Sequence, residues 1–66
     1  MNAREQKLIN WIDAAQQDEL RSMEAAMHAG DAFRHALHGA AFDALVAVRS
    51  KMAELVRADY EAGAPQ

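Results

Sequence analysis

Three histidines and an aspartate lie close together in the middle of this chain, and these residue types can bind a metal ion. Asp31, His35 and His38 are spaced to share one face of a helix, and His28 lies just before them. Imidazole and carboxylate groups are common ligands of divalent metals. The set lacks the Glu-x-x-His repeats of di-metal helical bundles. We therefore expect surface histidines and no cofactor, and keep a metal- or ligand-binding bundle using His28, His35 and His38 as an alternative function.

A polar pair, Gln16 and Glu19, lies among the apolar positions of the first half of the chain. A carboxylate inside a helical bundle could serve a catalytic or ligand-binding site. A polar layer can also fix the register of packed helices, and Glu19 could pair with an arginine or histidine of a second helix. The structural role is the simpler interpretation. Because the chain also has no Ser/His/Asp order, no Gly-rich phosphate loop and no nucleophile elbow, we expect no enzymatic activity.

Five further residues have the chemistry of a protein-binding surface: Trp11, Phe42, Val46, Arg49 and Tyr60. Tryptophan, tyrosine and arginine are enriched among the residues that carry binding energy in interfaces. Folding the chain near residue 30 brings Trp11 close to Arg49. We predict that these five residues bind a partner protein. The alternative is that they form the core of a homodimer.

The elements that position these residues are two helices. The chain is rich in helix-forming residues and poor in β-branched ones. Asn2 followed by Glu5 predicts a capping box, and Gly30-Asp31 combines a helix C-terminal signal with an N-cap. A turn this short predicts an antiparallel hairpin. The predicted single all-α domain, residues 1–66, consists of helix 3–29, turn 30–31, helix 32–62, continuous through Gly39, and tail 63–66.

Apolar residues of the two predicted helices recur at helical spacing. In the first helix they are Leu8, Ile9, Ile12, Leu20, Met23 and Met27, with Asp13 on the opposite, solvated side. In the second helix we expect one row to close the hairpin: Phe33, Leu37, Ala41, Leu45, Val48, Met52 and Leu55. The fold would place Ile12 level with Val48, and Gly39 would lie opposite this row.

A second apolar row, Phe42, Val46 and Tyr60, lies beside the first in helix 32–62. Together the two rows span more than the ~100° stripe that one neighbouring helix covers. A short chain without disulfides has little core of its own. We therefore predict a homodimer that forms an antiparallel four-helix bundle, with an obligate complex with another protein as the alternative.

The charge balance bears on the kind of partner. Ten acidic residues against seven Lys and Arg give a net charge of −3, which disfavours nucleic acid and anionic membranes. Acidic residues also interrupt the basic residues of the second helix, although an RNA-binding hairpin dimer remains a second alternative. The start of the chain lacks an apolar signal core, and no apolar run is long enough to span a bilayer. We expect a cytoplasmic protein without a membrane partner.

These features predict a small regulator, inhibitor or adaptor that binds a larger protein through a helix surface. Compact, alanine-rich chains without catalytic motifs are common among regulators encoded by phages and mobile elements. By that association we expect a similar origin here.

Overall fold

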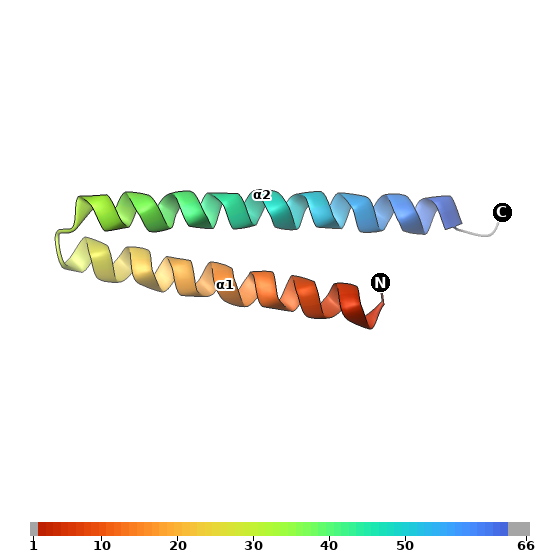
Figure 1. Ribbon diagram of the computed structural model, residues 1–66, viewed down its shortest axis with the longest axis horizontal. Helices are drawn as coiled ribbons and strands as arrows, with labels where there is room; N and C mark the ends of the chain where they lie inside the picture. Colours follow the sequence, from red (N-terminus) through yellow and green to blue (C-terminus); the bar gives the residue numbers. More distant parts are fainter. Residues whose placement is uncertain (1, 64–66) are drawn as a thin grey trace.

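The structure, a computed structural model that describes residues 2–63, is a hairpin of two long helices. Helix α1 spans Ala3–His28 and helix α2 spans Ala32–Gly63. They run antiparallel side by side, and α2 extends beyond the N-terminal end of α1 (Figure 1). The result is a flat rod of 56 × 17 × 11 Å. The all-α hairpin predicted from the sequence is confirmed, and most of the predicted tail lies outside the described residues.

The N-terminus of α1 has the predicted capping box. The Asn2 side chain accepts a hydrogen bond from the backbone N–H of Glu5 at 2.8 Å, and the Glu5 carboxylate accepts one from the backbone N–H of Asn2 at 3.2 Å. Both N–H groups lie at the helix start, where no backbone acceptor is available to them. The helix therefore begins where these two side chains satisfy its first donors.

The turn between the helices is a Schellman motif. Gly30 adopts a positive φ of 69°, which costs a glycine little and an L-residue with a Cβ more. The backbone N–H of Asp31 donates to the carbonyl of Ala26, and that of Gly30 donates to the carbonyl of Met27. Asp31 then caps α2 by accepting a hydrogen bond from the backbone N–H of Arg34 at 3.0 Å. The chain therefore reverses within a few residues, and the helices must pack against each other.

Buried and half-buried residues recur along both helices at alternating steps of four and three residues. This is the spacing of a coiled-coil interface, and we call it the seam. In α1 the seam consists of Glu5, Ile9, Ile12, Gln16, Glu19, Met23 and Ala26. In α2 it consists of His38, Phe42, Leu45, Arg49, Met52 and Val56. Only Ile9, Ile12 and Ala26 are buried among the described residues, so this hairpin encloses very little core.

The rotation of α2 differs from the prediction. Phe33, Leu37, Val48 and Leu55 were expected to close the hairpin, yet each is at least half exposed, and Phe33 is 77% exposed. Phe42, expected on the surplus side, faces α1 in the seam. The polar residues account for this rotation, because it brings His38 and Arg49 to carboxylates of α1. The alternative rotation would set those carboxylates against aliphatic side chains without partners, which is costly.

Because of the same rotation, Gly39 lies on a different side of α2 than predicted. Helix α2 passes through it without a break, as predicted, but Gly39 is half-buried beside the seam rather than on the outer side. A Cβ built at Gly39 would lie 3.6 Å from the methyl carbon of Met23. Within residues 2–63, neither helix contains a stretch that is long and apolar enough to cross a membrane.

Candidate interaction surface

An arginine–aspartate pair joins the two helices near the middle of the rod. Arg49 Nε donates to Asp13 Oδ1 at 2.5 Å, and Arg49 Nη2 reaches Asp13 Oδ2 at 3.5 Å. Hydrogen bonding to the carboxylate, helped by its charge, raises the pKa of Arg49. Asp13 was expected on a solvated face and is instead half-buried beside the seam. Arg49, predicted to bind a partner, is therefore engaged within its own hairpin.

A histidine–glutamate pair joins the helices nearer the turn. His38 Nδ1 lies 2.7 Å from Glu19 Oε2, and both side chains are about two-thirds buried or more. The prediction that Glu19 meets an arginine or histidine of the second helix is confirmed within a single chain. The two pairs give Glu19 and Asp13 of α1 specific partners on α2, so they favour one register and one rotation of the helices.

The three histidines do not converge on one point. His38 contacts Glu19, and His28 lies 3.7 Å from Glu24 on its own helix. His35 is exposed on α2. Within residues 2–63 no group of three or more His, Asp or Glu side chains is arranged to hold a metal ion. The spacing along the sequence therefore does not become a ligand cluster in three dimensions.

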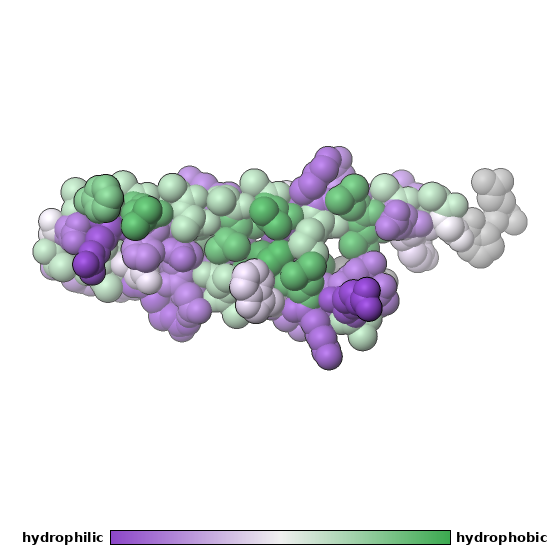
Figure 2. Space-filling model, in the orientation of Figure 1, coloured by the Kyte–Doolittle hydropathy of each residue, from purple (hydrophilic) through white to green (hydrophobic). Residues whose placement is uncertain are grey.

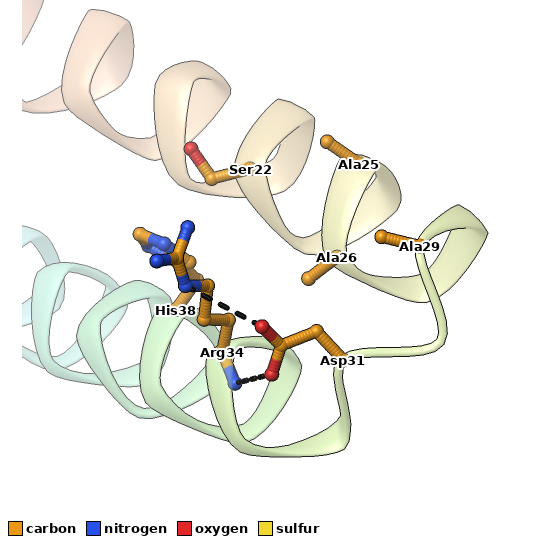
Figure 3. Close-up of a pocket in the computed structure, with 7 residues that line it drawn as sticks. All are labelled: Ser22, Ala25, Ala26, Ala29, Asp31, Arg34 and His38. Carbon is orange, nitrogen blue, oxygen red and sulfur yellow. Dashed lines mark hydrogen bonds and ion pairs between the residues drawn. The ribbon is translucent and has the colours of Figure 1, made fainter.

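A groove beside the turn shows which rows of the two helices share one side of the rod. Ser22 and Ala25 of α1 and Ala29 just after it line the groove together with Arg34 and His38 of α2, and its volume is about 360 Å³ (Figure 3). Residues seven apart lie in nearly the same direction on a helix in such a seam. The row through Ser22 continues to Ala15 and Leu8, and the row through Arg34 continues to Ala41, Val48 and Leu55. These rows therefore flank the same side of the seam.

Large apolar side chains are exposed on this side. Trp11 follows Leu8 by three residues, as Ala25 follows Ser22, so Trp11 lies on the same side of the rod. Leu37 follows Arg34 by about one turn and lies on this side too. We call the set Leu8, Trp11, Ala15, Leu37, Val48 and Leu55 the apolar face. Its five large members are between 46% and 64% exposed. Figure 2 shows this side, with hydrophobic residues along α2 and over the half of the rod away from the turn.

The other side of the rod carries a smaller apolar set. Met27 of α1 and Ala32 of α2 line a second groove there, of about 310 Å³. Seven-residue steps from Ala32 lead to Val46 and Tyr60, and one step back from Met27 leads to Leu20. We call Leu20, Met27, Val46 and Tyr60 the opposite flank. Tyr60 is the most exposed of the four, at 74%.

The five residues predicted to bind a partner are therefore divided among three places. Trp11 belongs to the apolar face, Val46 and Tyr60 belong to the opposite flank, and Phe42 and Arg49 lie in the seam. The sequence prediction missed Leu8, Val48 and Leu55 as surface residues because it assigned them to the hairpin core. The four-three spacing of His38, Phe42, Leu45 and Arg49 was the available signal, since it supplies partners for the carboxylates of α1.

The polar groups of the turn groove are engaged already. Arg34 Nε lies 3.4 Å from Asp31 Oδ2, and His38 contacts Glu19 (Figure 3). The other lining residues are Ser22 and three alanines. A catalytic or small-molecule site requires polar groups that converge on a ligand. This groove is therefore a hollow in the surface without polar groups that converge on a ligand.

No protein-family model, no curated protein and no solved structure matches this chain. What the chain does is therefore inferred from its own surface.

Proposed function

We propose that this chain is a non-enzymatic protein–protein interaction module, a small regulator, inhibitor or adaptor. In this proposal it associates with a second copy through the apolar face to form a four-helix bundle. The observation that carries the proposal is the apolar face itself. Five large apolar side chains lie about half exposed on one side of a chain whose described residues include only three buried ones. Contiguous exposed apolar surface of this kind marks an interaction site.

The scarcity of core supports an oligomer. A helical hairpin of this length gains little from its own packing, and no residue of α2 is buried. Most helical stability in proteins comes from packing an apolar face rather than from helix propensity. A partner on the apolar face would bury the side chains that the hairpin leaves in water. Two hairpins packed this way form a closed bundle with a single two-layer core.

The polar groups support binding rather than catalysis. Among residues 2–63 no polar or charged residue is buried, and no buried side-chain polar atom lacks a partner. Catalytic groups are usually poised in a water-excluding pocket with strongly shifted pKa values. Here the single shifted pKa that we describe, that of Arg49, follows from an ion pair between the helices. A helix surface that occupies part of a larger protein requires no such pocket.

The opposite flank is the place that we propose for the larger protein. In a bundle closed by the apolar face, Met27, Val46 and Tyr60 stay accessible, and an exposed tyrosine is a frequent anchor of protein interfaces. Tyr60→Ala is expected to abolish binding to that protein while the bundle persists. Loss of the bundle and of binding together would argue against separate surfaces.

Sedimentation equilibrium of matched glutamate variants tests the self-association. Val48 belongs to the apolar face, whereas its neighbour Ala47 points to the outer side of α2 and is also exposed. The parent chain is expected to be a dimer at micromolar concentration, and so is Ala47→Glu. Val48→Glu is expected to be monomeric, because its carboxylate would be buried without a partner. A monomeric parent chain, or equal effects of the two variants, would contradict the proposal.

A further inference from the structure

The apolar face has two unlike halves. The half away from the turn carries the bulky side chains of Leu8, Trp11, Val48 and Leu55. The half near the turn carries Leu37 on α2 but is hollow on the α1 side, because Ser22, Ala25 and Ala29 line the groove of about 360 Å³ there (Figure 3). Side chains that project from one half thus match a space of side-chain size in the other. A surface with both features can be complementary to itself.

The register of the hairpin fixes where the two halves meet. Asp13 lies level with Arg49, and Met23 lies level with Gly39. Between them, Ala15 lies level with residues 46–47 of α2. Ala15 is also midway along α1 between bulky Leu8 and small Ser22, and residues 46–47 are midway along α2 between Leu37 and Leu55. The midpoint between Leu8 and Ser22 on α1 therefore lies at the same level of the rod as the midpoint between Leu37 and Leu55 on α2.

We propose that the occupant of the apolar face is a second copy of this chain in antiparallel orientation, related by a two-fold axis that passes beside Ala15. Leu8 of each copy then lies against Ser22 and Ala25 of the other, in the groove beside the turn. Leu37 of each copy lies against Leu55 of the other. This orientation rests on the proposed self-association and specifies how the two hairpins meet.

Three properties of the face support this arrangement. A two-fold interface uses the same patch on both copies, which the matched bulky and hollow halves allow. The side chain at the axis is an alanine, so the two α1 helices can approach closely there. The side of the rod that carries the face spans 56 × 17 Å, the scale of the ~800 Å² per partner that a stable interface buries.

The competing orientation, with the turns of both copies at the same end, fits less well. It would set the bulky half of one copy on the bulky half of the other and leave both grooves empty. Empty apolar space removes packing contacts without any compensating gain.

Single-cysteine variants test the orientation directly, because the chain has no cysteine of its own. Ala15→Cys would place two sulfurs beside the axis, within the ~7 Å between Cα atoms that a disulfide spans. It is expected to form a disulfide-linked dimer on mild oxidation. Ala14→Cys, its neighbour on the exposed outer side of α1, is the matched control and is expected to remain unlinked. A mixture of Leu8→Cys and Ser22→Cys is expected to give mainly the mixed disulfide.

A groove-filling variant tests the same contact without oxidation. Ala25→Trp fills the hollow half from an exposed position and is expected to weaken dimerisation at least tenfold, whereas Ala14→Trp on the outer side leaves it unchanged. Circular dichroism verifies that both variants stay helical. A dimer that does not cross-link through Ala15→Cys would overturn this orientation and leave the proposed self-association standing. A parent chain that sediments as a monomer would overturn both.

Discussion

Of the two charged contacts between the helices, the Asp13–Arg49 pair is the more exposed to water. Both side chains are nearly half exposed, yet Arg49 holds both carboxylate oxygens. The Asp13→Asn and Arg49→Gln variants are each expected to lower the free energy of unfolding, and the double variant less than the sum of the two. Urea titrations of all four proteins at one fixed concentration give the coupling directly. Strict additivity of the two losses would contradict a direct contact.

Salt and pH affect this contact differently. Added salt is expected to reduce the coupling between Asp13 and Arg49, because exposed charges are screened. The pKa of Arg49 is raised in the folded chain, so the stability that its proton contributes is complete below the ordinary arginine pKa and lost only above it. That window lies in strong alkali. The arginine therefore keeps its charge throughout the pH range in which the hairpin would be studied.

The Glu19–His38 pair contributes more to the specificity of helix packing than to the stability of the hairpin. Its two groups are the polar members of the seam nearest the turn, and they contact each other at 2.7 Å. Polar pairs inside helical interfaces commonly select one register or rotation at some cost in stability. Here the pair explains why α2 presents His38 rather than its more apolar neighbour Leu37 to α1.

Gly30 and Gly39 have opposite roles. Gly30 has a positive φ at the turn, whereas Gly39 is helical, with room for a Cβ at ordinary contact distance from Met23. Gly30→Ala is therefore expected to destabilise the hairpin by about 1 kcal/mol, and Gly39→Ala to stabilise it by about as much. Thermal or urea unfolding at one concentration checks both signs. A destabilising Gly39→Ala would mean that the helices approach more closely than the Met23 contact indicates.

At the scale of the elements, local signals were readable from the sequence and the rotation was not. The capping box of Asn2 and Glu5, the turn at Gly30 and the continuity of α2 each depend on a few neighbouring residues, and the structure has all three. The point at which the chain reverses also sets the levels along the rod, and it places Arg49 beside Asp13, two residues after Trp11.

The side of α2 that faces α1 depends on a comparison across the whole seam. Apolar periodicity favoured the row through Leu37 and Val48, because it contains more large aliphatic residues. The structure instead uses the row through His38 and Arg49, whose charged groups meet Glu19 and Asp13. Counting apolar residues could not reveal this, since the decisive energies are those of polar groups that need partners. The predicted binding set was split for the same reason.

At the scale of the molecule, the hairpin is a rod with five large apolar side chains exposed on one side. The hairpin by itself leaves the large side chains of Leu8, Val48 and Leu55 about half exposed to water. Their burial would be the largest favourable term available to this chain, at about 25 cal/mol per Å² of apolar surface. Folding and association are therefore expected to be coupled, as in obligate dimers.

Coupled folding makes thermal stability depend on protein concentration. A hundredfold increase in chain concentration is expected to stabilise the folded dimer by about 2.7 kcal/mol, which follows from mass action. Circular dichroism melts at several concentrations should show a rising Tm for the parent chain and for Ala47→Glu. Val48→Glu should melt at a lower temperature, with no dependence on concentration, although Val48 is already half exposed in the hairpin. A Tm that stays constant over that range for the parent chain would mean that the hairpin is stable alone, and the apolar face would then have to be explained without a second copy.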